Sequence, residues 1–352
     1  MSHTTPMSTE RPALRFGVAY DFRNPPGFDG LSNAALYAAI LDQAALVDSL
    51  GFDQIWLTEH HFVDDGYLPA FVPVAGAIAA RTRHVRISTD VALLPFHQPL
   101  RLAEDLAVLD TLSAGRMELG IGMGYAVHEF EAFGMPRAQR VSRTEEAVHI
   151  MRLAWSDGPI SFRGKRFAIN GVNVYPKPVQ AGGIPLWMAA QSEAGALRAA
   201  ALSMHLLPQG TRDTVLDPWR AALRARGEDP GRYRVGLIRS FLVSNDPRRD
   251  WAIMKPSEVY RMRKYAQWAA SSGDKVADFK DPQRIPQHWI IGDAEHCVDE
   301  LTRFISAYGL TDVVTWGAPP GMRPSRMNES LERFAADVMP RVKSLYEQAA
   351  TT

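Results

Sequence analysis

The first third of the chain alternates short apolar runs with longer segments whose apolar side chains recur at helical spacing. The β-type runs are residues 14–20, 54–58, 85–94 and 117–122. The helical segments are residues 34–50, about 74–80 and 100–112. Gly51 directly follows the first helical segment, as a C-terminal stop does. This order predicts a βαβαβαβ arrangement.

The same alternation returns in the rest of the chain. Further β-type runs are residues 185–190, 234–243 and 312–316, with a weaker one at 205–208. A helix is expected over residues 143–155, opened by the capping-box pair Ser142 and Glu145. Another is expected over residues 294–308, with Asp293 as its cap and Gly309 as its stop, and an Ala-rich helix begins near Ser192.

Strands that are separated by helices and buried on both faces indicate a parallel sheet. About eight strand–helix units in 352 residues suit an α/β fold of the (β/α)8 TIM-barrel type. The alternative is an open doubly wound sheet with a second domain, which requires a G-x-G-x-x-G turn. The chain instead has G-x-G-x-G at Gly120, Gly122 and Gly124, a weak match.

Two stretches do not fit the repeating unit, namely residues 160–183 and 246–287. Insertions of this size on the C-terminal face of a barrel usually build or cover the active site. We therefore predict a flexible N-terminal tail at residues 1–12 and one barrel domain over 13–352. Within that domain we expect residues 246–287 to form a lid.

Composition narrows the class of protein further. Lys and Arg total 39, as do Asp and Glu, so the zero formal charge argues against a nucleic-acid or membrane-surface partner. A single cysteine, Cys297, excludes an intrachain disulfide, which fits a reducing cytoplasm. The polar start resembles no signal peptide, and the most apolar region, residues 67–80, is interrupted by prolines and too short to span a bilayer.

The motif Trp-Leu-Thr-Glu-His-His-Phe at residues 56–62 ends the second predicted strand, where a barrel presents its catalytic mouth. Neighbouring side chains on an extended chain point to opposite sides, so one of His60 and His61 faces the pocket and the other lies behind it. Imidazole titrates near neutral pH and suits acid–base work, the role we favour for His60. The alternatives are a purely structural pair and a metal site, but no cluster with ligand spacing accompanies the histidines.

Two further sequence features are weaker evidence for a ligand-binding site. The alternating glycines at 120, 122 and 124 permit close approach of a ligand to the backbone, or else serve turn geometry alone. Ser192 begins a helix, where amides bind phosphate, although a serine there is often only a cap.

In this order, the motifs resemble the luciferase-like, flavin-dependent monooxygenase family. The resemblance spans residues 14–343 and includes Leu-Pro-Phe-His-Gln-Pro at 94–99 and Phe-Ala-Ala-Asp-Val-Met-Pro at 334–340. It implies a TIM barrel that uses reduced FMN, supplied by a transient flavin reductase partner, together with oxygen. It also implies a homodimer.

The resemblance carries residue roles onto this chain. His60 matches the catalytic histidine beside the flavin, His61 next to it is expected to serve catalysis as well, and Gln191 and Ser192 match the phosphate-binding pair. Thr89, Asp90 and residues Gly122, Met123, Gly124 and Tyr125 should line the flavin ring or its ribityl chain. Ala75, within the segment 74–76, matches the place where luciferase has a non-proline cis peptide.

Two departures from luciferase bear on the cofactor. Met123 and Gln191 replace an arginine and a glutamate, and loss of the arginine removes a charge-assisted phosphate contact of about 1.5–3 kcal/mol. Either another basic residue substitutes or FMN binds weakly, as a diffusible cosubstrate does. The family's deazaflavin-dependent reductases and dehydrogenases remain an alternative, as does a barrel that only binds flavin.

The aromatic residues of 246–287, with Trp289 and Trp316 as further walls, favour a small apolar substrate such as an aldehyde or ketone. Ordinary packing is the alternative explanation for these rings. Water has to be kept from the reacting flavin, which is why a lid is expected.

Overall fold

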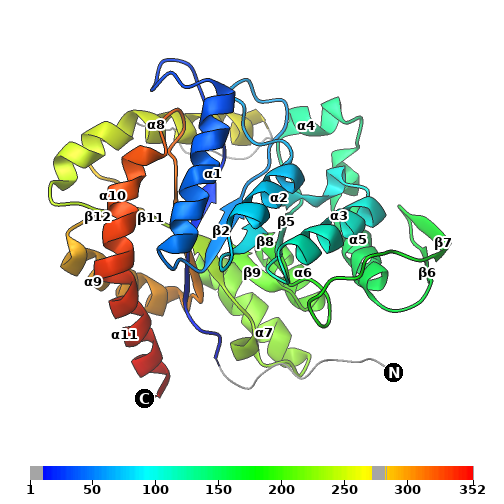
Figure 1. The fold of residues 1–352 in the computed structure, drawn as a ribbon. Coiled ribbons are helices and arrows are strands. Elements are labelled where there is room, and N and C mark those ends of the chain that lie inside the picture. Colours follow the sequence, from blue (N-terminus) through cyan, green and yellow to red (C-terminus); the bar gives the residue numbers. More distant parts are fainter. Residues whose placement is uncertain (1–10, 272–281, 283, 352) are drawn as a thin grey trace.

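The computed structural model describes residues 11–271, 282 and 284–351. Parallel strands form a closed ring inside a layer of helices (Figure 1). In ring order the strands are β1 (Arg15–Tyr20), β2 (Gln54–Leu57), β3 (Arg86–Thr89), β5 (Leu119–Gly122), β8 (Leu186–Ala190), β9 (His205–Pro208), β10 (Gly236–Ile238) and β13 (Asp312–Trp316). Single bridges, Ile87–Met117 and Leu206–Val235, join the sheet segments into this ring. The ring confirms the predicted TIM barrel and is incompatible with the open doubly wound sheet.

The helices cover the outside of the ring and one of its ends (Figure 1). They are α1 (Asn33–Ser49), α2 (Phe71–Arg81), α3 (Pro99–Leu112), α4 (Val127–Ala132), α5 (Arg140–Trp155), α6 (Glu193–Ala201), α7 (Asp217–Ala225), α8 (Pro247–Ser271), α9 (Ala294–Tyr308), α10 (Ser325–Arg333) and α11 (Met339–Thr351). The predicted ends of α9 are confirmed, because the Asp293 side chain accepts a hydrogen bond from the His296 amide and Gly309 adopts a φ of 63°. Ser192 likewise caps α6.

The predicted capping box was wrong. Helix α5 begins at Arg140, with Gln139 before it, and Ser142 instead donates from its hydroxyl to the Gln139 carbonyl. Glu145 pairs with Arg198 of α6, 2.8 Å away. Tertiary contacts therefore use both side chains that the sequence pattern assigned to a cap.

Several strands also differ from the pattern. The run at 85–94 is split into β3 and β4 (Ala92–Leu93), and the run at 234–243 into β10 and β11 (Ser240–Val243). The sequence pattern missed β12 (Trp289–Gly292), which pairs in parallel with β11. Within the insertion at 160–183, β6 (Ile160–Arg163) and β7 (Ala168–Val172) form an antiparallel hairpin.

The structure describes only Arg11 and Pro12 of the predicted N-terminal tail. The Tyr346 hydroxyl donates to the Pro12 carbonyl, and the Arg11 guanidinium lies over the Tyr346 ring. Of the predicted lid, residues 272–281 and 283 lie outside the described residues. None of the described helices is long and apolar enough to cross a membrane.

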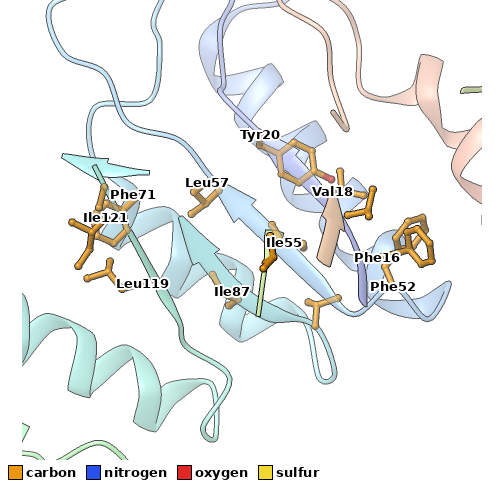
Figure 2. Close-up of a cluster of buried hydrophobic side chains, with 14 of the residues drawn as sticks. Phe16, Val18, Tyr20, Phe52, Ile55, Leu57, Phe71, Ile87, Leu119 and Ile121 are labelled. Atoms are coloured by element: carbon orange, nitrogen blue, oxygen red, sulfur yellow. The ribbon is translucent and has the colours of Figure 1, made fainter. Parts of the chain in front are cut away.

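Alternation along the strands divides the core into two parts. Figure 2 shows the outer part, where Val18 of β1, Ile55 and Leu57 of β2, Ile87 of β3 and Ile121 of β5 pack toward the helices. The residues between them point into the barrel. Trp56 of β2 contacts Trp187 of β8, and because these strands are not neighbours in the ring, their contact fills the interior.

Glycine lets β5 approach β3 and β4 closely. A Cβ atom at Gly120 would overlap the Thr89 carbonyl oxygen, and one at Gly122 would collide with Val91. The Thr89 hydroxyl donates to the Gly120 carbonyl oxygen over 2.6 Å and accepts from the Gly120 amide over 3.0 Å. Strand packing, and not only access for a ligand, therefore requires these glycines.

We expect Gly120→Ala to lower the free energy of unfolding by about 3 kcal/mol, because the obstructing atom belongs to backbone and cannot move aside. Gly76→Ala in α2 is the matched control. Its Cβ would meet only Leu109 at an ordinary 3.5 Å, so we expect a change within about 1 kcal/mol, toward stabilisation. Urea denaturation of both variants measures the difference, and equal losses would contradict this account of β5.

Candidate active site

A cavity of about 700 Å³ lies at the carboxyl ends of the barrel strands. This volume is within the range of small-molecule and cofactor sites, roughly 300–1,000 Å³. Its wall includes the ends of β2, β3, β5, β8 and β13 through residues such as His60, Asp90, Gly122, Ala190 and Trp316. Active sites of TIM barrels are built at this face.

His60 lines the cavity and is held by a buried carboxylate. Its Nδ1 lies 2.9 Å from Oε1 of Glu129, which comes from α4 and is fully buried. The same oxygen accepts a hydrogen bond from the His61 amide, 2.8 Å away. An ionised carboxylate only accepts hydrogen bonds, so Nδ1 carries the proton and Nε2 is the ring atom left to accept one. Glu129 therefore fixes both the orientation and the tautomer of His60.

His61, which was also expected to serve catalysis, does not line the cavity, because its ring is bound to a buried carboxylate. Its Nε2 lies 2.9 Å from Oε1 of Glu59, which also lies 2.9 Å from His97 Nε2, while Glu59 Oε2 accepts from the Leu93 amide. Burial raises the pKa of the Glu59 carboxyl, but the charges and hydrogen bonds of the two imidazoles outweigh burial and lower it to about 2. The same carboxylate raises the pKa of His97 against the opposing effect of burial. This buried cluster ties the loop after β2 to that after β4.

Aromatic rings surround the His60 imidazole. The centroids of Trp268 and Tyr67 lie 4.7 and 4.9 Å from it, and that of Tyr125 lies at 5.7 Å. Trp268 belongs to α8, which lies across the same end of the barrel as α4 (Figure 1). Tyr265 and Ala269, from the same turn of α8, line the cavity itself.

Polar contacts anchor α8 over this end of the barrel. The Tyr260 hydroxyl donates to Asp65 over 2.8 Å, and Lys264 pairs with Asp64 at 2.9 Å. The hydroxyls of Tyr67 and Tyr265 lie 3.1 Å apart. Asp64, Asp65 and Tyr67 all follow β2, so the loop that carries His60 also holds the helix that covers it.

One rim of the cavity is positively charged. Gln191 and Ser192 at the start of α6 line it together with Arg137 and Arg140, which precede or begin α5. Ser192 accepts from the Gly195 amide over 3.4 Å and thereby caps the helix. Two guanidiniums and a helix N-terminus form a setting that suits a phosphate group.

The sequence pattern did not single out these two arginines. The sequence feature that could have pointed to them is their position, because they are basic residues between the glycine run and the following helix. His97 stands within the motif quoted above for residues 94–99, whereas Glu129 lies outside the quoted motifs, and only the structure gives the two residues their partners.

Most residues predicted to bind the cofactor come together at the cavity. Its wall contains Asp90, Gly122, Met123, Gly124, Tyr125, Gln191 and Ser192. Thr89 does not line it, because the Thr89 hydroxyl is bound to the backbone of β5. Of the two tryptophans predicted as walls, Trp316 lines the cavity, whereas Trp289 packs against Trp251.

Ala75 requires a correction. It is fully buried in α2, away from the cavity wall, and the expected cis peptide in segment 74–76 was wrong. The non-proline cis bond joins Asp90 and Val91, between β3 and β4, and a second cis bond precedes Pro176. Ala75 is therefore left out of the candidate site.

Within the described part of the chain, no group of three or more His, Cys, Asp or Glu side chains is arranged to hold a metal ion. The carboxylate–imidazole pairs beside the cavity contact one another instead.

The family model for luciferase-like monooxygenases matches residues 14–311. The chain belongs to this family. Its curated relatives include 4-hydroxyprotoasukamycin monooxygenase of Streptomyces nodosus subsp. asukaensis, 25% identical over 333 residues that cover 86% of this chain and 85% of that protein. The oxygenase component of flavin-dependent trigonelline monooxygenase from Acinetobacter baylyi is 25% identical, covering 89% and 91%. The F420-dependent glucose-6-phosphate dehydrogenase of Amycolatopsis mediterranei is 24% identical, covering 87% and 95%.

Solved structures of other proteins share the fold. Monooxygenase RslO1 from Streptomyces bottropensis superposes with a TM-score of 0.82 at 24% identity, over 93% of this chain and 99% of the other. The oxygenating constituent of 3,6-diketocamphane monooxygenase from Pseudomonas putida, in complex with FMN, gives 0.77 at 17% identity over 94% and 99%. At these identities the similarity establishes the barrel and leaves cofactor and substrate to be argued from the site.

Proposed function

We propose that this protein is the oxygenase component of a two-component monooxygenase. It would take up reduced FMN as a diffusible cosubstrate, from a transient flavin reductase, and use oxygen to oxidise a small apolar aldehyde or ketone. The observation that carries the proposal is a cavity-facing imidazole, His60, fixed by Glu129 at a cavity whose lining also includes residues that suit a phosphate. A relative named as an oxygenase component supports the reductase partner, and a structural neighbour holds FMN.

The chain's own residues suit this cofactor. Backbone at Gly122 and Gly124 adds no bulk to the cavity wall, and Arg137, Arg140 and the start of α6 would hold the phosphate. Luciferase has an arginine where this chain has Met123. Arg137 and Arg140 would replace its positive charge at the cavity. Bound reduced flavin would supply the electrons that activate oxygen.

Protons would be managed by His60. With Nδ1 donating to Glu129, the Nε2 atom can accept a proton from the reacting centre and return it. The aromatic rings of α8 and the loop after β2 would keep bulk water from the imidazole and leave an apolar surface for the substrate.

Hydride transfer with F420 is the second candidate, because F420-dependent dehydrogenases stand among the relatives at nearly the same identity. Fluorescence titration with FMN and with F420, followed by reduction and exposure to oxygen, separates the two. The proposal requires that FMN binds and that its reduced form is reoxidised with substrate oxygenation. The homodimer stays a prediction.

We expect Arg140→Met and Ser192→Ala each to weaken FMN binding. The arginine variant should weaken it by about tenfold or more, because it loses a charge-assisted contact to the phosphate. Riboflavin, which lacks the phosphate, should bind both variants like the wild type. Arg224→Met, which changes an exposed arginine of α7, is the matched charge control. Parallel losses for FMN and riboflavin would contradict a phosphate site at this rim.

We expect His60→Ala to reduce oxygenation of a substrate that the wild type accepts by about 10²–10⁴-fold, while FMN affinity changes only a few-fold. Glu129→Gln should lower the rate less, since the ring remains but loses its charged partner. His149→Ala, on the exposed face of α5, is the control. Wild-type turnover by the His60 variant would remove it from the mechanism.

We expect Trp268→Ala to uncouple flavin oxidation from product formation, because the ring that covers His60 is removed. The measurement is hydrogen peroxide released per reduced FMN oxidised in the presence of substrate, and the expected change is an increase. Ile253→Ala alters an exposed residue of the same helix and should leave the ratio unchanged. Unaltered coupling in the Trp268 variant would refute the covering role of α8.

A further inference from the structure

Asp90 occupies a central place in the cavity wall. It follows β3, and its amide donates to the Leu57 carbonyl of β2 over 2.8 Å. On its other side Val91 packs against Gly122 at the end of β5. The Asp90 side chain therefore lies at the cavity between the strand ends that carry His60 and the glycine run.

The Asp90 carboxyl differs from the other acidic groups near the cavity. Glu59 accepts hydrogen bonds from two imidazoles and an amide, and Glu129 accepts from His60 and the His61 amide. Among the described residues, Asp90 has neither a hydrogen bond to its carboxyl nor an ion pair. Burial, with no compensating partner, raises its pKa to about 7. The neutral acid is thus accessible at physiological pH, and it is a hydrogen-bond donor.

We propose that Asp90 donates a hydrogen bond to the isoalloxazine ring and takes up a proton when the flavin binds. This inference rests on the proposed function, because it requires a flavin in the cavity. The edge of the isoalloxazine ring carries acceptor nitrogen and oxygen atoms, which a carboxylic acid can satisfy and an ionised carboxylate cannot. An ionised Asp90 would also repel the negative charge that reduced flavin develops.

Other ionisable groups face the same cavity. They are Glu59 and His60 from the end of β2, Tyr67 from the following loop, Tyr125 after β5, Arg137 and Arg140 beside α5, and Tyr265 of α8. The phosphate of FMN titrates as well. A test must therefore compare proteins that differ at Asp90 alone.

The experiment measures the dissociation constant of FMN by fluorescence quenching from pH 6 to pH 9. The proteins are the wild type, Asp90→Asn and the exposed control Asp157→Asn. The asparagine at position 90 keeps a donor at every pH. Relative to it, wild-type affinity should fall about tenfold from pH 6 to pH 8, as the free carboxyl ionises. The Asp157 variant should follow the wild type.

Calorimetric titration in two buffers of different ionisation enthalpy gives the protons taken up. At pH 8 the wild type should take up close to one proton per FMN more than Asp90→Asn, and at pH 5.5 the difference should vanish. Identical pH dependence in the two proteins would overturn the inference, as would loss of FMN binding by a folded Asp90→Asn. Failure of the wild type to bind FMN at any pH would instead overturn the proposed function.

Thermal unfolding provides a readout without flavin. The pKa of Asp90 is higher in the folded protein than in the unfolded chain, so the folded state binds its proton more tightly, and stability falls as pH rises from about 4 to 7. Asp90→Asn has no such loss, so its melting temperature should exceed that of the wild type at pH 8, and the gap should narrow at pH 4.5. A melting temperature at pH 8 equal to or below that of the wild type would overturn the account of an unpartnered carboxyl.

Discussion

The close approach of β5 to β3 and β4 is the constraint on which the site depends. Gly120 and Gly122 leave no room for a side chain, so the Thr89 hydroxyl can bond to the backbone of β5 and Val91 can pack over Gly122. This contact fixes where the backbone turns between β3 and β4. It therefore sets the position of Asp90 and one wall of the cavity, and a larger residue at either glycine would disturb both.

Two buried carboxylates hold the histidines at and behind the cavity in place. Glu129 reaches from α4 to His60 and to the amide of His61, and Glu59 joins His61 to His97. Glu59 has hydrogen-bond partners on both oxygens, and Glu129 has two on its Oε1 atom, which offsets the cost of burying these carboxylates in the protein interior. The two adjacent histidines consequently have different roles. His60 faces the cavity, and His61 secures the loop behind it.

The relatives of this chain include proteins named as monooxygenases and as F420-dependent dehydrogenases, so family membership alone does not assign the reaction. The features that bear on the choice lie at the strand ends. They are the cationic rim, the imidazole with its fixed tautomer, the aromatic cover of α8 and the unpartnered acid at Asp90. Each can be altered without changing the barrel, which allows cofactor binding, proton transfer and exclusion of water to be measured separately.

Much of this protein could be predicted from the sequence by itself. Alternation of apolar runs and amphipathic segments determined the barrel, because periodicity and burial on both faces are local properties of the chain. The Glu-His-His motif and the start of α6 were placed at the mouth for the same reason, since a strand's carboxyl end marks that face. Local chemistry also determined the cap at Asp293 and the stop at Gly309.

Tertiary structure alone decided which side chains meet. Arg137 and Arg140 line the same cavity as His60, and Ser142 and Glu145 have partners other than the expected cap. Ala75 of α2 is fully buried and does not line the cavity. These outcomes depend on contacts between residues far apart in the chain, which no local pattern encodes. The unpaired state of Asp90 is of the same kind, because the absence of a partner is a property of all the surrounding elements together.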